Sequence, residues 1–407
     1  GVSRIIDSSL FDNARKKLLI STDGHQGDRC TRLWQEYTKR KSFASMTDQT
    51  YFENCVSKME KKFLENPDTK VIIATCSSLA GNLTSTFSPH TMLFDEASTI
   101  TELELTAALK PCKADTLQRV VLIGDPAQLP PCVISTEAKR TGVSSWMERL
   151  WQCHYTNDAC AARHMQAVQL VKQYRCHPGL TDFSNEWVYV TNGLIKGLRP
   201  LETPDAVATQ RSQEGTMFRW NMNTDKDAPI TTHPPWPIAW LDVKGAEDSR
   251  GHGYDNSQEA DATLSLIQRL LNIGLGTSDI AVITPYKRQV EMIKSKLSAI
   301  SSGVLVRVGS VDGTQGLEYK CVIMSTVRTV NEALPFVKDL RRSNVCLTRA
   351  KAAFFFIGHY EAICSRAHKS KNNEIRKSNE AWHWLGIELF KRRQVFDCKP
   401  HTLESLI

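Results

Sequence analysis

The sequence contains no long hydrophobic run. Its apolar stretches, such as 352–358, are far shorter than the roughly 20 residues that cross a bilayer as a helix. No basic segment followed by apolar and then small residues opens the chain, so we expect no secretory leader. The 12 cysteines follow no regular spacing, which favours reduced thiols over a disulfide framework. We therefore expect an intracellular protein of the cytoplasm or nucleus, without a membrane partner.

The chain also lacks a large net charge of either sign. The 51 basic and 44 acidic residues leave a net charge of +7, which permits a polyanionic partner without requiring one. Hydrophobic residues make up 41% of the 407 residues and charged residues 23%, a balance that excludes disorder as the main state. No repeat of fixed period is present, and a chain of this length predicts two or three domains.

The first 70 residues are rich in charge and place their apolar residues at helical spacing. The stretches 28–41 and 51–64 both follow this pattern. Asn66-Pro67-Asp68 ends the second stretch, because proline and its neighbours stop a helix. We predict a small helical hairpin in this region.

Beyond residue 70 the pattern changes to short apolar runs that end in polar residues or glycine. Such runs are typical of strands in a parallel sheet covered on both faces. The predicted strands are 71–74, 92–94, 120–123, 238–243, 280–283, 321–324 and 354–357. The stretches 164–174, 257–272 and 288–299 predict helices between them. The fold class is therefore α/β.

Two further segments have a distinct composition. The stretch 198–237 is rich in Pro, Thr, Asp and Asn and predicts a long surface loop inside the second domain. The last forty residues hold Trp382, Trp384 and Leu385 before the run Lys391-Arg392-Arg393. We interpret them as a docking helix with a solvated basic end, in preference to a nucleic-acid-binding tail.

An apolar run delivers two adjacent acids in Met92-Leu93-Phe94-Asp95-Glu96. Ligands bind at the carboxyl ends of strands in open α/β sheets. Asp95 there is suited to Mg²⁺, which prefers hard oxygen ligands and phosphate partners. Glu96 is suited to orient or deprotonate a water that attacks a phosphate. Taken alone, this pattern fits a helix cap or surface acids equally well.

Three more segments carry chemistry. In 121–131 a predicted strand runs into a glycine turn that carries Asp125 and Gln128. Glutamine both donates and accepts hydrogen bonds, which suits contact with a terminal phosphate or its bound water. A tight polar turn without a ligand is the alternative. In 173–178 an arginine follows a tyrosine, a pair suited to stack on a base and to bind phosphate. A buried arginine that ties a helix to a neighbouring loop is the alternative. Finally, 308–318 is dense in small polar residues and 341–351 is strongly basic.

In this order the segments resemble the motifs of superfamily 1 helicases, and of their Upf1-like 5′→3′ group in particular. The resemblance spans roughly residues 70–365. Its motifs are 71–81 (Ib), 95–98 (II, Walker B), 124–129 (III), 173–178 (Gln-Tyr-Arg-Met-His-Pro, with Cys176 for Met), 283–286 (Thr-Pro-Tyr), 310–318 (V) and 344–351 (VI). Seven motifs in the family's order make a chance agreement negligible.

The resemblance implies two RecA-like parallel-sheet domains, the first of them incomplete. It divides the chain into a helical insertion (1–70), the remainder of the first RecA-like domain (71–160), the second RecA-like domain (161–370) and a C-terminal helical tail (371–407). ATP and Mg²⁺ are the implied cofactors. The partner is single-stranded nucleic acid, RNA in the first place and DNA as the alternative.

The resemblance also assigns roles to individual residues. Asp95 is expected to bind Mg²⁺ and Glu96 to position the hydrolytic water. Gln128 is expected to contact the γ-phosphate, and Arg175 and Arg349 to act as arginine fingers from the second domain. The remaining expected nucleotide contacts are Tyr174 at the base, Glu318 at the ribose, and Asp125 and Gly316. The expected contacts to nucleic-acid phosphates are Thr75, Ser77, Thr284 and Ser310.

The family's phosphate-binding loop, G-x-x-x-x-G-K-[ST], does not occur in these 407 residues. Gly24-His25-Gln26-Gly27 has no lysine. The chain also begins with Gly1. We expect the carboxyl-terminal portion of a longer helicase, inactive by itself. The alternative is a degenerate form that no longer binds ATP and serves as a non-catalytic nucleic-acid-binding or scaffold protein.

The sequence supports a metal site less well than it supports the resemblance to helicases. Cys153-His154 and the pair Cys160 and His164 lie close together in the sequence, but the close pair of thiolates typical of zinc sites is missing. Buried thiols and surface imidazoles are the expectation. No nucleophile elbow and no redox C-x-x-C occurs either, which disfavours hydrolase and oxidoreductase chemistry of those kinds.

Overall fold

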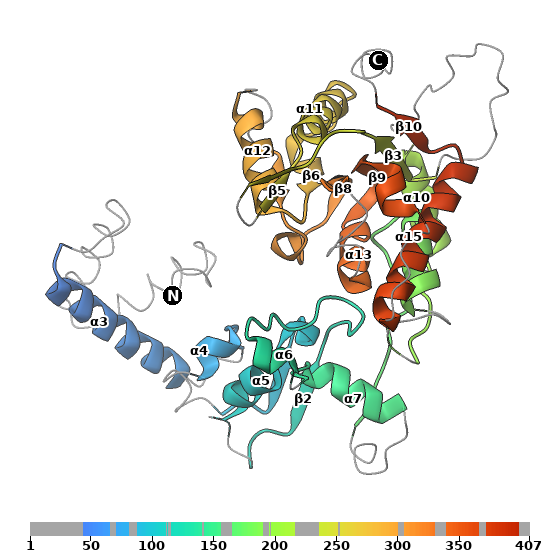
Figure 1. Ribbon diagram of the computed structural model, residues 1–407. Coiled ribbons are helices and arrows are strands. Elements are labelled where there is room, and N and C mark those ends of the chain that lie inside the picture. The colour runs from blue at the N-terminus through green and yellow to red at the C-terminus, as the bar shows by residue number, and fades with distance from the viewer. Residues whose placement is uncertain are drawn as a thin grey trace. The chain divides into compact units, whose positions relative to one another are not determined.

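The computed structural model (Figure 1) describes residues 44–65, 71–80, 88–110, 112, 115–140, 142–155, 165–189, 195, 197–215, 236–250, 253–299, 305–329, 339–365 and 372–398. The chain divides into two compact units. The first comprises residues 1–125 and 131–149, and the second comprises residues 126–130 and 150–407.

The first unit is built on a β-α-β crossover. Strand β1 (Thr91–Phe94) pairs in parallel with β2 (Arg119–Leu122), and helix α5 (Glu102–Leu109) connects them. Thr101 begins α5 with a capping box, because its hydroxyl accepts the Glu104 N–H and the Glu104 carboxylate accepts the Thr101 N–H. Phe94 and Leu105 lie in the core of this unit. Both predicted strands, 92–94 and 120–123, are confirmed.

The remaining described elements of the first unit precede β1 or follow β2. They are α3 (Met46–Glu65), α4 (Cys76–Ala80), η3 (Ala97–Thr99), α6 (Thr136–Arg140) and the start of α7 (Trp146–Tyr155). The helix predicted at 51–64 is confirmed, whereas 28–41 lies outside the described residues. The strand predicted at 71–74 is wrong: these residues form coil, and Val71 and Ile73 are exposed. A strand needs a hydrogen-bonding neighbour, and among the described residues β1 pairs only with β2.

A six-stranded parallel sheet organises the second unit, in the order β10-β3-β9-β8-β6-β7 (Figure 1). Its strands are β3 (Ile238–Asp242), β6 (Ile280–Ile283), β7 (Arg307–Gly309), β8 (Tyr319–Ser325), β9 (Ala350–Gly358) and β10 (Val395–Asp397). The runs predicted at 238–243, 280–283, 321–324 and 354–357 are all strands here. The predicted α/β class with a parallel sheet is confirmed.

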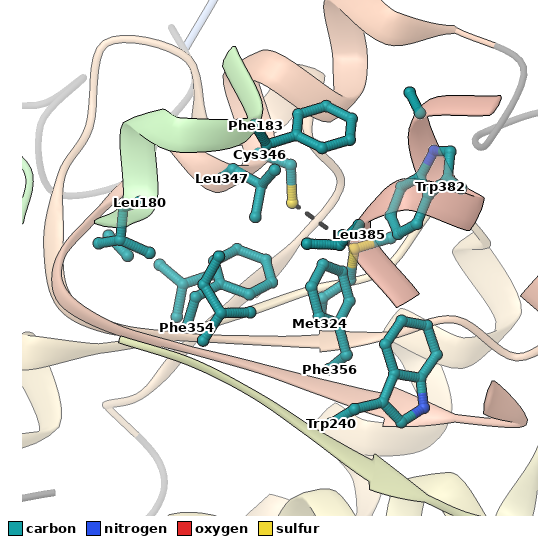
Figure 2. Packing of buried hydrophobic residues seen from close by; sticks show 14 of the residues in the cluster. Leu180, Phe183, Trp240, Met324, Cys346, Leu347, Phe354, Phe356, Trp382 and Leu385 are labelled. Carbon is teal, nitrogen blue, oxygen red and sulfur yellow. Dashed lines mark hydrogen bonds between the residues drawn. The ribbon is translucent and has the colours of Figure 1, made fainter. Parts of the chain in front are cut away.

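Both faces of this sheet are covered. Phe354 and Phe356 of β9 belong to the core cluster on one face, whereas Phe355 and Ile357 belong to the cluster on the other. This alternation follows from the period of two along a strand. Figure 2 shows Phe354 and Phe356 packing with Trp240, Trp382 and other buried side chains of the first face. Burial of each such side chain contributes about 1.5–3 kcal/mol.

The helices divide between the two faces. Helices α11 (Ser257–Asn272) and α12 (Lys287–Ser298) supply apolar residues to the cluster that contains Phe355. Helices α9 (Pro178–Ser184), α13 (Leu340–Leu347) and α15 (Asn373–Lys391) supply residues to the cluster that contains Phe354. The helices predicted at 257–272 and 288–299 are confirmed. Smaller elements are η4 (Asn185–Tyr189), the antiparallel hairpin β4 (Asp248–Arg250) and β5 (Gly253–Asp255), η6 (Thr277–Asp279), η7 (Asp312–Thr314) and α14 (Tyr360–Cys364).

Two predictions within the second unit are wrong. The segment 165–174 is extended, not helical: Gln173 donates its N–H to Glu202 O, and Glu202 donates to Val171 O. Along this segment half-buried and exposed residues alternate. This period of two is typical of an extended chain and not of a helix. The predicted loop 198–237 contains helix α10 (Asp205–Gly215). The residues of α10 include good helix formers such as alanine, glutamine and arginine. They lie between prolines of the predicted loop, and the composition of the whole stretch therefore favoured a loop.

The end of the described chain joins the core. The docking helix expected from Trp382 and Leu385 is α15, and both side chains are buried. After it, β10 adds an edge strand beside β3, which no sequence pattern had predicted. Arg392 is not merely solvated, because its guanidinium lies 4.7 Å from the ring centroid of Trp236 and also pairs with Glu388.

A buried polar network lies where β8 and β9 end. Glu259 of α11 is 0% exposed. Its Oε2 accepts hydrogen bonds from the Ser325 hydroxyl (2.8 Å) and from the Val327 N–H (2.7 Å). Val327 has φ 68°, a left-handed conformation that is a clear outlier for a β-branched residue and costs on the order of 1–3 kcal/mol. The buried carboxyl group therefore holds a strained turn in place.

Glycine is required next to this network. A Cβ placed on Gly358, at the end of β9, would lie 1.8 Å from the Thr326 hydroxyl oxygen and 3.2 Å from Glu259 Oε1. Both distances are shorter than ordinary van der Waals contact. The close approach of the two strand ends thus depends on the absence of a side chain at position 358.

The burial of Glu259 generates a prediction about pH. Burial raises the pKa of this carboxyl group from 4.5 to about 8, so the native state keeps a proton that the unfolded chain loses between these values. The free energy of unfolding should therefore fall as the pH rises from 4.5 to 8, by up to about 1.4 kcal/mol per pH unit. Glu259→Gln cannot ionise and should remove this contribution. Denaturant titrations of both proteins across this pH range measure it, and parallel pH profiles would contradict the prediction.

Candidate functional site

The two acids that follow β1 lie in a turn in which Glu96 has a left-handed backbone conformation. Asp95 is exposed and Glu96 is half-buried. The Asp95 carboxylate accepts the Glu96 N–H at 3.0 Å. Glu96 has φ 51° and ψ 37°, a conformation that costs a non-glycine residue roughly 1–2 kcal/mol. Strain of this kind is concentrated at functional sites in proteins.

The neighbouring strand holds this turn in position. The N–H of Ala97 donates to Ile123 O at 2.8 Å, and the Ile123 N–H donates to Phe94 O at 2.8 Å. A Cβ on Gly124 would lie 3.0 Å from the Ala97 nitrogen, so the glycine after β2 allows this close approach. The turn thereby buries Ala97 and leaves the Asp95 carboxylate exposed at the carboxyl end of β1.

The segment after Asp125 belongs to the second unit. Ala127 is wholly buried, and its carbonyl accepts a hydrogen bond from the Asn344 side-chain amide at 3.2 Å. Leu129 lies in the core cluster with Phe354. Gln128 stands between these two anchors and is half-buried. The second unit therefore fixes the backbone on both sides of Gln128.

Gln173 closes the turn that carries Arg175. Its Oε1 accepts the N–H groups of Arg175 (3.0 Å) and Cys176 (2.8 Å). Its Nε2 donates to Cys176 O at 2.8 Å and to the Thr203 hydroxyl. One amide thus satisfies polar groups on both sides of the turn, which explains why a glutamine suits this position. Tyr174 projects outward and is 64% exposed.

Two cations share the carboxylate of Glu318. Arg175 Nε lies 2.7 Å from Glu318 Oε2, and Lys351 Nζ lies 2.6 Å from Oε1. These contacts lower the pKa of the Glu318 carboxyl group, the Lys351 hydrogen bond most of all. Gly316, in the loop that leads to Glu318, has φ 76°, which glycine adopts without strain. The structure thus brings the predicted residues Arg175, Gly316 and Glu318 into one region.

Lys351 has no predicted role, although it lies inside the segment that resembles motif VI. Nothing in the sequence places it beside Glu318. Its position as the second residue of β9, next to the strand β8 that follows Glu318, accounts for the contact. A pairing of strands so far apart in the sequence has no local signal.

Arg349 occupies a different environment from Arg175. It is 2% exposed, and its Nη1 donates to Leu317 O at 3.2 Å. The Tyr319 N–H donates to the Arg349 carbonyl at 2.9 Å. In this structure the Arg349 guanidinium is directed at the loop before β8, whereas Arg175 lies partly exposed beside Glu318.

The residues expected to contact nucleic acid differ in exposure. Thr75 and Ser77 are exposed, and the Thr75 hydroxyl accepts the Ser78 N–H at the start of α4. Ser310 is exposed after β7, and its hydroxyl accepts the Gly313 N–H. Thr284, directly after β6, is 0% exposed.

Within the second unit the predicted residues lie at opposite edges of the sheet. Thr284 and Ser310 follow β6 and β7, so they lie at the carboxyl edge of the parallel strands. Glu318 and Arg349 precede β8 and β9, so they lie at the amino edge, with Arg175 bound to Glu318. The unit therefore presents two separate groups of candidate residues.

The described part of the chain offers no group of three or more metal-binding side chains. Cys153 and His154 lie on α7, whereas Cys160 and His164 are outside the described residues. Among the helices that the structure describes, none is long and apolar enough to span a membrane.

Comparison with known proteins identifies the family. A model described as AAA domain matches residues 143–361, just over half of the chain, and a second AAA domain model matches residues 12–136. The chain belongs to the AAA domain family. Its curated relatives place it with the Upf1-like superfamily 1 helicases.

Three relatives illustrate the similarity. A regulator of nonsense transcripts 1 homolog of Neurospora crassa is 29% identical over 370 residues, which cover 88% of this chain and 29% of the relative. The 5′-3′ DNA helicase ZGRF1 of Mus musculus is 30% identical over 301 residues (72% and 14%). The probable helicase senataxin of Homo sapiens is 29% identical over 286 residues (68% and 10%). The chain thus spans less than a third of the length of these relatives.

Solved structures of helicases also match. The arterivirus nonstructural protein 10 helicase is 13% identical, and the match covers 75% of this chain and 50% of that one with a TM-score of 0.29.

The shared carboxylate of Glu318 generates a prediction. Lys351→Met removes the strongest of the contacts that lower the pKa of Glu318, so this pKa should rise toward its usual value. Carboxyl-carbon chemical shifts followed against pH measure the change. Lys391→Met, which removes a lysine paired with Glu388, is the matched control and should leave the Glu318 pKa unchanged. An unaltered pKa in Lys351→Met would show that the ion pair does not form in solution.

Proposed function

We propose that this chain is the motor region of an ATP-dependent helicase that moves 5′→3′ along single-stranded nucleic acid. The single observation that carries the proposal is the pair of the exposed Asp95 and the half-buried Glu96 in a strained turn at the carboxyl end of β1, within a chain of the Upf1-like group. Carboxylates in this position suit the hydrolysis of a nucleoside triphosphate. In the proposed cycle ATP is bound by residues of both RecA-like domains, and its hydrolysis releases them.

The proposed nucleotide contacts come from both units of the chain. Asp95 would hold Mg²⁺, since an exposed carboxylate is the hard oxygen ligand that this ion prefers, and the ion supplies charge neutralisation on the phosphates. Glu96 would orient the attacking water, with Gln128 at the γ-phosphate. Arg175 and Arg349 would stabilise the charge on the transferring phosphoryl group. Asp125, Tyr174, Gly316 and Glu318 complete the proposed nucleotide contacts.

The proposed polynucleotide track uses Thr75, Ser77, Thr284 and Ser310. Contacts to phosphates are tolerant of sequence, as a translocating enzyme requires. We propose RNA as the first choice, because several relatives are named regulators of nonsense transcripts. DNA is the alternative, since the name of another relative is 5′-3′ DNA helicase ZGRF1. RNA processing, decay or silencing is the proposed biological setting.

Substitution of Glu96 tests the proposed function. In the complete protein, with any sequence that flanks these 407 residues, Glu96→Gln should lower ATP hydrolysis stimulated by single-stranded RNA by about 10²–10⁴-fold and leave nucleotide binding intact. Glu137→Gln, which changes an exposed glutamate of the same unit paired with Arg140, is the control. Turnover of Glu96→Gln at the wild-type rate would exclude the assigned role. Absence of hydrolysis in the unmodified complete protein would instead favour the non-catalytic scaffold.

Arg349 provides a second test of the same proposal. Because the charge of an arginine finger matters most in the transition state, Arg349→Ala should lower the hydrolysis rate by about 10³-fold and affect ATP affinity far less. Arg307→Ala is the matched control, since Arg307 also donates to a backbone carbonyl, that of Gly313, in the loop between β7 and β8. Equal losses in hydrolysis and affinity would argue for a binding role alone.

A further inference from the structure

Helix α10 contacts the turn that carries Arg175. The Nε of Arg211 on α10 donates to the backbone carbonyl of Arg175 at 2.7 Å. The same guanidinium binds both carboxylate oxygens of Glu214 through Nη1, at 2.8 and 2.7 Å. The side chains of Arg211 and Glu214 are only 13% and 26% exposed. An ion pair that is largely shielded from water holds its geometry better than one on the surface.

The next residue of α10 makes a second contact with the turn. The Ser212 hydroxyl lies 3.2 Å from Nε2 of His177. The Nδ1 of His177 accepts the Gly179 N–H at 3.1 Å, which leaves the ring proton on Nε2 to be donated to Ser212. Burial lowers the pKa of His177 and favours this neutral form. Two successive residues of α10 thus bind the turn on either side of Cys176.

These bonds fix the backbone of Arg175 from two sides. Its N–H donates to Gln173 Oε1, and its carbonyl accepts from Arg211. The N–H of His177 donates to Lys351 O at 2.7 Å, which ties the same turn to β9. The half-exposed Arg175 side chain is held only by Glu318 among the bonds described above. The arrangement therefore combines a rigid backbone with a side chain that can exchange its partner.

A cationic side chain stabilises a transition state best when it is already oriented toward the group on which negative charge develops. Displacement by about 1 Å, caused by a change remote from the reacting atoms, costs up to ~10²-fold in rate. The carbonyl carbon of Arg175 is bonded directly to the Cα that bears the guanidinium side chain. A donor that fixes the orientation of this peptide group therefore helps to fix the direction in which the Cα–Cβ bond of Arg175 leaves the main chain.

We propose that Arg211 is a positioning residue for Arg175, and that α10 acts as a brace for the arginine finger. This inference rests on the proposed function, because it requires Arg175 to act on the triphosphate. Arg211 itself does not touch the nucleotide in this proposal. It acts through the peptide group of Arg175, and Ser212 supports it through His177.

The alternative is that Arg211 only stabilises the fold. A double substitution distinguishes the two roles, because effects that pass through one residue are not additive, whereas independent effects are. If Arg211 acts through Arg175, removal of the Arg211 guanidinium should have no further effect once the Arg175 side chain is gone.

The experiment uses the complete protein with Arg211→Met, Arg175→Ala and the double variant. Single-turnover hydrolysis of ATP gives the rate, and a fluorescent ADP gives nucleotide affinity. Arg211→Met should lower the rate by about ten- to a hundredfold, with the affinity unchanged within about twofold. On the Arg175→Ala background it should change the rate by less than about twofold. Arg140→Met is the control, because Arg140 also pairs with a glutamate three residues away but is exposed and remote from the turn in sequence.

A second variant, Arg211→Lys, tests the same role with a smaller change in case Arg211→Met does not fold. Arg211→Lys keeps a cation for Glu214 but lacks the forked guanidinium that reaches the carboxylate and the carbonyl together, so it should show a partial loss of rate at an unchanged melting temperature. Binding of ADP with aluminium fluoride, a mimic of the transferring phosphoryl group, should weaken in both Arg211 variants relative to binding of ADP.

The outcomes separate the two proposals. A wild-type rate in Arg175→Ala would overturn the role of Arg175 in the proposed function, and this inference with it. A large loss in Arg175→Ala together with a wild-type rate in both Arg211 variants would overturn this inference alone. A further tenfold loss in the double variant, or a fall in the melting temperature that parallels the loss of rate, would assign Arg211 a purely structural role.

Discussion

Parallel pairing of β8 with β9 is the constraint on which the second unit depends. The two central strands run side by side from Tyr319 and Ala350 to Ser325 and Ile357. Because they are parallel, their first residues and the loops before them meet at one edge of the sheet, and their last residues and the loops after them meet at the other. Glu318 and Lys351 meet for this reason, and so do Ser325 and Gly358 with the buried Glu259. Few side-chain contacts of the site would survive a shift in this register.

The fold was largely predictable because its signal is local and apolar. The runs that became β3, β6, β8 and β9 are short and hydrophobic, and the structure buries them almost completely. Predictions failed where tertiary context decided the outcome. Residues 71–74 are apolar enough for a strand but have no strand neighbour among the described residues. Helix α10 was hidden by the prolines and polar residues around it.

The site was predictable only in part, for a related physical reason. Motif order identified the residues of the proposed nucleotide site, including Arg175 and Glu318, but it could not show that Lys351 binds the other oxygen of the same carboxylate. It also gave no indication that Arg349 is nearly buried, or that Arg211 binds the peptide group of Arg175. These facts depend on residues separated by 30 or more positions, which only the folded chain brings together.

The length of β8 limits how the two groups of candidate residues in the second unit communicate. The strand has seven residues, and at about 3.3 Å per residue it separates its two ends by roughly 20 Å. An arginine side chain reaches only about a third of that distance, so no single residue is able to touch ligands at both ends. Any signal that crosses the unit must therefore pass through intervening residues, as a movement of whole strands, of the side chains packed on them or of the loops that join them.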